Sequence, residues 1–284
     1  MRILVTGGSG FLGSRIVKAY DEAGKYKVFA PGHREMDLQN QEDVDSAFKA
    51  VRPDVVIHCA AASDVAWCGR NPELSWKINV EGTDNIAGAC GRWGAKLVFC
   101  SSDQVYFGSK VTEAHREEET LAPANVYGKQ KLEGEKRCLD GNKNSVILRL
   151  SWMYDRGKLS ENEHGNFMQT FLEAREKGKK LIFPIYDFRG ITDIRPVVEN
   201  LEKVFALPAG IYNYGSENDY STYETVRLLL KGTGISNMEL EENREAFADA
   251  PRNLRMDGDK MRRYGIVFPG TLEGLMDALK QETL

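Results

Sequence analysis

The sequence predicts an α/β fold in which a parallel sheet carries helices on both of its faces. Short apolar runs alternate with helical patterns through the first half of the chain, and a glycine-rich segment directly follows the first run. Strand–helix–strand repeats need crossover connections, which is why they favour parallel strands. With 284 residues, the chain is also long enough to bury a large core.

Five strands and four helices are expected in the first half. Residues 2–6 (RILVT) and 54–60 (DVVIHCA) are short apolar runs that predict buried strands. The helix expected at 43–51 has apolar residues at spacings of three and four, which place them on one face. In chain order we expect strand 2–6, helix 11–23, strand 27–30, helix 43–51, strand 54–60, helix 78–93, strand 96–101, helix 125–139 and strand 145–150.

The second half has a less regular pattern. Residues 152–166 are polar and contain glycine, which predicts a loop. No low-complexity linker separates the two halves, so we expect the second half to pack against the first. The other expected elements are helix 167–177, strand 181–185, helix 196–205, strand 210–214, helix 222–231, a loop or short strand at 251–257 and helix 271–282.

The composition argues against several classes of protein. The chain has 38 Lys and Arg against 42 Asp and Glu, a net charge of −4, which disfavours a broad surface for nucleic acid or anionic membranes. No apolar run has the length of a membrane span, and the N-terminus does not resemble a secretory signal. The five cysteines and four histidines form no metal-ligand pattern. We therefore expect a cytoplasmic protein without a metal, a nucleic-acid partner or a membrane partner. No helix carries a decisive apolar stripe, so a monomer and a homodimer both stay open.

Residues 6–13 (TGGSGFLG) lie between a predicted strand and a predicted helix. In this context, glycines permit the tight turn, let a pyrophosphate approach the backbone and let the helix pack closely against the sheet. The helix N-terminus also stabilises negative charge. The segment therefore predicts a dinucleotide cofactor, with candidate contacts at Gly7, Gly10, Phe11, Leu12 and Gly13.

The end of the second predicted strand favours NADP over NAD. NAD-binding proteins of this kind place an Asp or Glu there for the ribose hydroxyls. This chain has APGHR at 30–34, with no acidic residue and with Arg34 within reach of a 2′-phosphate. Arg34 is therefore a candidate cofactor contact, and NAD remains the alternative.

Tyr127 and Lys131 lie four residues apart at the start of a predicted helix, so they share one face. A nearby ammonium favours tyrosinate, and we expect Lys131 to lower the pKa of Tyr127. Ser102 follows the strand expected at 96–101, and ligands collect at the carboxyl ends of parallel strands. The three residues are candidate catalytic groups; a solvated Tyr–Lys pair and a turn serine are the structural alternatives.

The glycine segment, the strand-end serine and the Tyr-x-x-x-Lys pair, in this order, resemble the extended short-chain dehydrogenase/reductase superfamily. The resemblance implies a Rossmann-like doubly wound parallel sheet with a smaller C-terminal α/β substrate lobe. Further stretches are similar to the dTDP-4-dehydrorhamnose reductase family: residues 36–65, 96–108, 124–135, 148–154, 164–167, 210–215 and 250–257. Residues 1–150 would form the dinucleotide-binding domain, and 151–284 mainly the substrate lobe, with some segments packing back on the sheet.

The family resemblance also implies a reaction, the NADPH-dependent reduction of a nucleoside-diphosphate 4-keto-6-deoxy sugar. Ser102, Tyr127 and Lys131 match its catalytic triad, with Tyr127 as the proton donor. The other matching positions are Asp37 and Leu38 beside the adenine, Ala60, Ala61 and Ala62 beside the cofactor, and Asp103, Gln104, Trp152, Asn166 and Asn253 on the substrate side.

Three departures from the family pattern leave the exact sugar open. Gln104 stands where the family usually has Tyr, Ser102 stands where it usually has Thr, and the family's Gly-x-Pro-Thr stretch is replaced by RGITD at 189–193. NVEGT at 79–83 is more similar to the sugar-nucleotide epimerases.

Other functions stay open at this point. One is an NAD-dependent sugar-nucleotide epimerase or dehydratase. Another is a non-catalytic NADP-binding regulatory subunit similar to the methionine adenosyltransferase beta subunit. A third is a redox-sensing regulator that binds only the cofactor.

Overall fold

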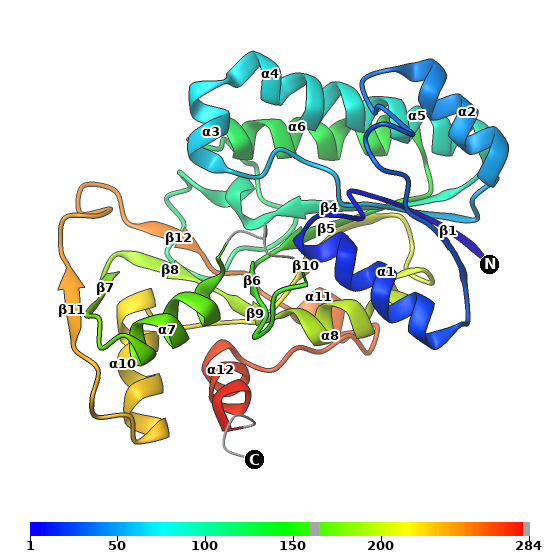
Figure 1. The fold of residues 1–284 in the computed structure, drawn as a ribbon. Helices are drawn as coiled ribbons and strands as arrows, with labels where there is room; N and C mark the ends of the chain where they lie inside the picture. Colours follow the sequence, from blue (N-terminus) through cyan, green and yellow to red (C-terminus); the bar gives the residue numbers. More distant parts are fainter. Residues whose placement is uncertain (160–164, 281–284) are drawn as a thin grey trace. The chain divides into compact units, whose positions relative to one another are not determined.

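A six-stranded sheet with the order β10-β5-β4-β3-β1-β2 organises the chain in a computed structural model, which describes residues 1–159 and 165–280 (Figure 1). β1 pairs in parallel with β2 and β3, and β3 pairs in parallel with β4. The predicted α/β fold with a parallel central sheet is confirmed. The strands are β1 (Arg2–Thr6), β2 (Lys27–Phe29), β3 (Val55–His58), β4 (Lys96–Ser102), β5 (Ser145–Leu150) and β10 (Gly210–Tyr214).

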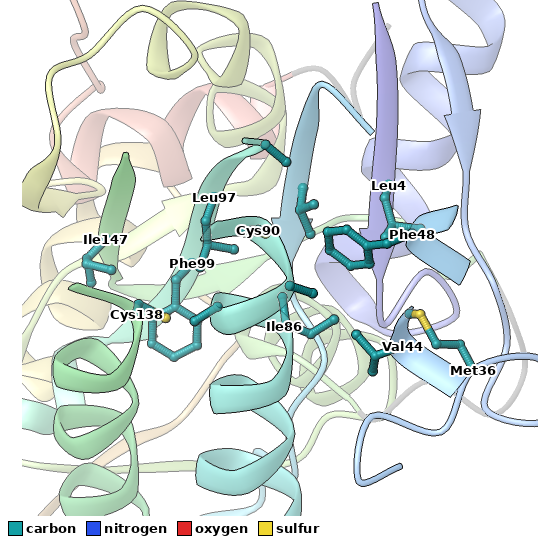
Figure 2. Packing of buried hydrophobic residues seen from close by; sticks show 14 residues of the cluster. Leu4, Met36, Val44, Phe48, Ile86, Cys90, Leu97, Phe99, Cys138 and Ile147 are labelled. Atoms are coloured by element: carbon teal, nitrogen blue, oxygen red, sulfur yellow. The ribbon is translucent and has the colours of Figure 1, made fainter. Parts of the chain in front are cut away.

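Helices cover both faces of this sheet. α2 (Gln41–Val51), α5 (Gly82–Trp93) and α6 (Val126–Gly141) lie along one face, and α1 (Phe11–Ala23) lies on the other (Figure 1). Side chains from the strands and from the first group of helices form one continuous core, in which Phe48, Ile86 and Phe99 are fully buried (Figure 2). This core packs these helices against the sheet.

The chain divides into two units. Unit 1 comprises Met1–Val105, Ala122–Arg149 and Val198–Tyr212, and unit 2 comprises Tyr106–Leu121, Leu150–Val197 and Asn213–Leu284. Unit 2 contains its own core, built around Tyr154, Phe167 and Phe171. Three parallel strand pairs belong to unit 2: β6 (Trp152–Tyr154) with β9 (Ile191–Asp193), β7 (Leu181–Pro184) with β11 (Leu240–Asn243), and β8 (Asp187–Arg189) with β12 (Arg252–Leu254).

The remaining elements are short or belong mainly to unit 2. α10 begins after Ser221, whose hydroxyl accepts from the Glu224 amide at 3.1 Å, and ends at Gly234 in the left-handed conformation. The elements are α3 (Val65–Arg70), α4 (Pro72–Trp76), the π-helical η1 (Lys77–Glu81), the 3-10 helix η2 (Asp103–Tyr106), α7 (Phe167–Glu176), α8 (Ile194–Glu199), α9 (Leu201–Val204), α10 (Thr222–Thr233), α11 (Asp259–Arg262) and α12 (Thr271–Lys280).

The structure corrects several expected elements. The helix expected at 78–93 is preceded by helical turns from Pro72, which continue through π-helical η1 into α5. The loop expected at 152–166 contains strand β6, and its residues 160–164 lie outside the described residues, as does the expected helix end beyond residue 280. The helix expected at 196–205 is two short helices separated at Asn200. Short strands β8, β9 and β11 were not expected, because three or four residues carry too little pattern.

Two further features concern membranes and metals. Among the residues that the structure describes, no helix is both long and apolar enough to cross a lipid bilayer. Within the same residues, no three His, Cys, Asp or Glu side chains gather closely enough to hold a metal ion. The five cysteines are free thiols.

The contact between α5 and α6 generates a stability prediction. A Cβ atom on Gly91 would lie 2.3 Å from the carbonyl oxygen of Gly141, so Gly91→Ala forces two backbones apart. We expect Gly91→Ala to lower the free energy of unfolding by about 1–3 kcal/mol, the usual range for overpacking. Urea unfolding measures this. Gly69→Ala is the matched control, because a Cβ in that helix meets nothing within 4 Å; an equal loss in both variants would contradict the prediction.

Buried His58 generates a prediction about pH. The His58 ring is fully buried between the hydroxyls of Thr6 at 2.6 Å and Thr83 at 3.0 Å. Burial, assisted by the charge of Lys131, lowers the pKa of His58 to about 3. Below its ordinary pKa of about 6.5, the unfolded chain binds a proton that the folded chain does not, so stability falls as the pH falls.

We therefore expect the free energy of unfolding to decrease between about pH 6.5 and pH 4 by up to ~1.4 kcal/mol per unit from this group alone. Urea unfolding of His58→Gln across this range should show a flatter dependence than the wild type. His33→Gln, on the exposed segment after β2, controls for the substitution itself. An unchanged slope in His58→Gln would refute this account.

Candidate active site

The glycine segment turns sharply between β1 and α1. Gly7 has a φ of +68°, in the left-handed region that favours glycine, and the Gly10 amide donates to the Gly7 carbonyl at 2.9 Å. A Cβ on Gly7 would lie 2.7 Å from the Ala60 amide nitrogen, and one on Gly13 would lie 2.2 Å from the Gly7 oxygen. Both positions therefore require glycine, because backbone lies where a side chain would begin.

The N-terminus of α1 is open to an anion. Gly10 occupies the N-cap position without a capping side chain, and the first turn, which includes Phe11 and Leu12, carries no acidic residue. Gly10 is exposed. Amide N–H groups at a helix start have no partner within the helix, and the helix dipole favours negative charge beside them. The residues present therefore fit the pyrophosphate of a dinucleotide.

The segment after β2 lies against the glycine turn. A Cβ on Gly8 would lie 2.8 Å from the Ala30 Cβ, and Arg34 is exposed a few residues further on. Asp37 accepts from the Gln39 amide at 3.0 Å, and the Leu38 carbonyl accepts from Asn85 at 2.8 Å. Arg34, Asp37 and Leu38 thus belong to the same unit as the glycine segment, and their cofactor contacts stay predictions.

Direct contacts link the carboxyl ends of three strands. The Cys59 amide donates to the Thr6 carbonyl at 3.2 Å, which ties the end of β3 to β1. The Sγ atoms of Cys59 and Cys100 lie 3.5 Å apart, and this contact links the end of β3 to β4. Lys131 Nζ then donates to the Cys100 carbonyl at 2.8 Å. The glycine segment, the alanines at 60–62 and Lys131 therefore lie along one edge of the sheet.

Asn79 holds the segment with Ala60, Ala61 and Ala62 in place. Its side chain accepts from the Ala62 amide at 2.8 Å and donates to the Ala62 carbonyl at 3.0 Å. It also donates to Gln130 of α6 at 2.9 Å. Asn79 and Gln130 were not expected as supports of the site. A π-helical turn such as η1 often occurs at functional sites, but the residue spacing does not reveal one.

Tyr127 and Ser102 face each other at this edge. Tyr127 is buried, and its phenol is a hydrogen-bonding neighbour of the Ser102 hydroxyl. Burial, followed by the charge of Asp103, raises the pKa of Tyr127 above its ordinary value, while the bond to Ser102 opposes this shift. The expected net lowering of the Tyr127 pKa is wrong for this structure, because burial disfavours tyrosinate and the pKa is raised.

Lys131 is buried one helical turn from Tyr127. Its Nζ lies 4.6 Å from the centre of the Phe99 ring and 5.9 Å from that of Tyr127, besides its bond to Cys100. Burial lowers the pKa of Lys131. A buried ammonium needs acceptors and ring faces of this kind, so these contacts fix where the Lys131 side chain points.

Asp103 and Gln104 connect the strand end to the start of α6. The backbone amide of Gln104 donates to Ser102 Oγ at 3.2 Å. Its side-chain oxygen accepts from the Asn125 side chain at 2.9 Å, and its side-chain nitrogen donates to Asp103 at 3.4 Å. A Cβ on Gly128 would lie 2.3 Å from the Gln104 carbonyl oxygen. Gln104, which departs from the family pattern, thus supports the first turn of the helix that carries Tyr127.

The other three substrate-side candidates lie in unit 2. Trp152 is half-buried on β6. Its ring packs edge-on against the Phe167 ring, with 5.7 Å between the ring centres, and the Arg189 guanidinium lies 5.0 Å from the Trp152 ring centre. Asn166 caps α7 by accepting from the Gln169 amide at 3.2 Å. His164, in the matching stretch at 164–167, lies outside the described residues.

Asn253 has a structural role within unit 2. Its amide donates to the carbonyls of Val111 at 2.9 Å and Glu113 at 2.6 Å, and its oxygen accepts from Arg255 at 3.0 Å. These contacts hold the segment at 111–113 against the end of β12. A role of Asn253 toward a substrate stays a prediction.

Known proteins are similar to this chain over most of its length. The family model described as RmlD substrate binding domain matches residues 1–283. The spore coat polysaccharide biosynthesis protein SpsK of Bacillus subtilis (strain 168) is 30% identical over 248 residues, 87% of this chain and 85% of the relative. A dTDP-4-dehydrorhamnose reductase of Aggregatibacter actinomycetemcomitans is 28% identical and covers 93% of this chain and 94% of its own. The methionine adenosyltransferase 2 subunit beta of Pongo abelii is 26% identical, and the match covers 93% of this chain and 83% of that protein.

Solved structures share the fold over nearly the full length. The dTDP-4-dehydrorhamnose reductase of Bacillus anthracis, in complex with NADP, superposes with a TM-score of 0.86 at 23% identity and covers 99% of this chain and 98% of that one. The UDP-glucose 4-epimerase of Thermus thermophilus, in complex with NAD, gives 0.76 at 25% identity, with 97% of each chain covered. Because the family model spans almost every residue, the chain belongs to the RmlD substrate binding domain family, as its motifs predicted.

Proposed function

We propose that the protein is an NADPH-dependent oxidoreductase that reduces the keto group of a nucleoside-diphosphate 4-keto-6-deoxy sugar. One observation carries the proposal: a glycine turn at a helix start without acidic residues and the Ser102–Tyr127–Lys131 group, in which Tyr127 and Lys131 are buried, lie along the same edge of one sheet. This arrangement brings a dinucleotide's binding residues and a proton donor to one place, as carbonyl reduction requires.

The chain's own residues would hold the cofactor at this edge. The start of α1 would bind the pyrophosphate, Arg34 would bind a 2′-phosphate, and the segment 60–62 would line the path toward Lys131. When bound, NADPH supplies the hydride that the carbonyl carbon receives. Lys131 would also donate to the nicotinamide ribose.

Tyr127 is suited to donate the proton. Its raised pKa keeps the phenol protonated at neutral pH, so the O–H is available when the carbonyl oxygen gains negative charge. Ser102 would donate a hydrogen bond to the same oxygen and stabilise that charge. The ammonium of Lys131, on the same helix face, would then stabilise the tyrosinate left behind.

The names of similar proteins support the proposed reductase activity and narrow the class of substrate. The relative that is 28% identical is named a dTDP-4-dehydrorhamnose reductase, and a solved structure with this name contains NADP. A dTDP-linked 4-keto-6-deoxy sugar is therefore the first substrate to test. GDP-linked sugars come second, because Gln104 and the segment 189–193 depart from the family pattern.

A second candidate function is that of a non-catalytic, NADP-binding regulatory subunit. Relatives named methionine adenosyltransferase 2 subunit beta are 25–28% identical to this chain, about as similar as the reductase. In that case, cofactor binding persists without turnover. The deciding assay follows loss of NADPH absorbance with dTDP- and GDP-4-keto sugars. A cofactor that stays bound through purification, without net oxidation, would instead indicate an NAD-dependent epimerase or dehydratase.

Tyr127→Phe tests the proton donor. We expect turnover to fall at least ~100-fold, the usual contribution of general acid catalysis, with NADPH affinity nearly unchanged. Steady-state kinetics and fluorescence titration with NADPH measure the two quantities. Tyr20→Phe is the matched control, since Tyr20 is also a buried tyrosine on a helix beside the sheet. Equal turnover in wild type and Tyr127→Phe would refute the assignment of the donor.

Arg34→Ala tests the choice of cofactor. A hydrogen bond to a charged group contributes about 1.5–3 kcal/mol to binding. We therefore expect the dissociation constant for NADPH to rise at least about tenfold, while that for NADH stays unchanged. Titration with both cofactors measures the ratio of dissociation constants. Arg263→Ala, an exposed arginine of unit 2, is the control. An unchanged ratio would remove Arg34 from the cofactor site.

A further inference from the structure

A buried ion pair lies behind the strand end that carries Ser102. Glu135 of α6 and Arg149 of β5 are each 2% exposed, and the guanidinium donates Nε to Glu135 Oε1 at 3.0 Å and Nη2 to Oε2 at 2.7 Å. Such a pair loses the hydration of both charges, and apolar residues of similar size often stabilise a fold equally well. The pair therefore calls for a role other than stability.

The carboxylate of Glu135 also contacts β4. Ser101 Oγ donates to Glu135 Oε1 at 2.6 Å, and Ser101 is the residue before Ser102. Adjacent residues share a peptide unit, so a Ser101 side chain anchored to α6 limits how the backbone of Ser102 can turn. The ion pair thus joins β4, β5 and α6 at the position where the candidate active site begins.

Glu135 continues the row of active-site residues along α6. Tyr127, Lys131 and Glu135 are spaced by four residues, so they lie on one helix face, and all three are buried. Burial lowers the pKa of Lys131, and the negative charge of Glu135 is among the influences that raise it. The same carboxylate therefore acts on two members of the candidate triad.

We propose that Glu135, oriented by Arg149, is a positioning residue that fixes Ser102 through Ser101 and stabilises the ammonium form of Lys131. Its effect on turnover rests on the proposed function. Its effects on Lys131 and on the β4 end do not, and both can be measured without substrate or cofactor.

The charge of Lys131 depends on every polar group packed around it. The neighbouring elements contribute His58 and Cys59 from β3 and its end, Cys100 from β4, and Tyr127, Glu135 and Cys138 from α6. Burial raises the pKa of the Cys138 thiol. The hydrogen bond to Cys100, together with burial, raises the pKa of the Cys59 thiol. Both thiols are therefore neutral near pH 7. His58, with its lowered pKa, is neutral as well. Among these neighbours Glu135 is the carboxylate, so replacing it by Gln removes a negative charge near Lys131.

The first test titrates Lys131 directly. In protein labelled with ¹⁵N-lysine, NMR follows the Lys131 side chain against pH, assigned by comparison with Lys131→Met. We expect the midpoint in Glu135→Gln to lie at lower pH than in wild type. Asp187→Asn is the matched control, because it breaks a partly buried ion pair, Asp187–Arg252 of unit 2, at 2.8 Å. A midpoint that does not move in Glu135→Gln would overturn the electrostatic part of the proposal.

The second test keeps the ion pair and removes only the hydroxyl that links it to β4. In Ser101→Ala we expect faster amide hydrogen exchange at Ser102 and Asp103, and a roughly tenfold lower kcat with NADPH affinity unchanged, since misplaced catalytic groups slow a reaction by up to ~100-fold. Ser145→Ala is the matched control: it removes another fully buried strand hydroxyl, which donates to Cys138 at 2.8 Å.

The outcomes separate this inference from the proposed function. If the wild type reduces no 4-keto sugar, the proposed function fails, while the Lys131 titration and the amide exchange still decide the role of Glu135. If Glu135→Gln does not fold, Ser101→Ala decides it. Equal exchange at Ser102 in Ser101→Ala and Ser145→Ala would overturn the positioning role.

Discussion

The hydrogen bond from Lys131 to the Cys100 carbonyl is the interaction on which the arrangement of the site depends. A buried ammonium is costly unless acceptors surround it, so α6 is held at the one position along β4 where Lys131 reaches a strand-end carbonyl. That position sets Tyr127 against Ser102 one helical turn away. It also places both beside Cys59 and the segment at 60–62, which in turn lies against Gly7. A single buried side chain thus couples the proposed proton donor to the proposed cofactor site.

The glycines of the turn after β1 also make this coupling possible. The turn after β1 approaches α1 and the end of β3 so closely that a side chain at Gly7 or Gly13 would overlap backbone atoms. The polar supports are equally specific, since Asn79 satisfies both the amide and the carbonyl of Ala62. The edge of the sheet is therefore built from backbone groups held by buried side chains. Locked backbone groups of this kind are what a preorganised site requires.

The sequence predicted those parts of the molecule that depend on residues close together in the chain. Branched apolar runs gave the bounds of β1, β5 and β10, and apolar spacing gave those of α1. Motif order placed Ser102 at a strand end and Tyr127 and Lys131 on one helix face. The π-helical turn before α5 and strand β6 escaped prediction, because packing rather than local pattern decides them. The partners of Glu135 lie 14 and 34 residues away, so only the spacing of four from Tyr127 through Lys131 to Glu135 could have indicated its place.

The direction of the Tyr127 pKa is the clearest example of a property that pattern alone cannot give. A lysine four residues from a tyrosine suggests a stabilised tyrosinate, but that inference assumes a solvated pair. In the folded protein, burial acts on both groups in opposite directions: it raises the pKa of the phenol and lowers that of the ammonium, so each group is pushed toward its neutral form. A neutral phenol is the form that can donate a proton to a developing alkoxide. The proposed role of Glu135 fits this balance, since its charge counters part of the effect of burial on the pKa of Lys131.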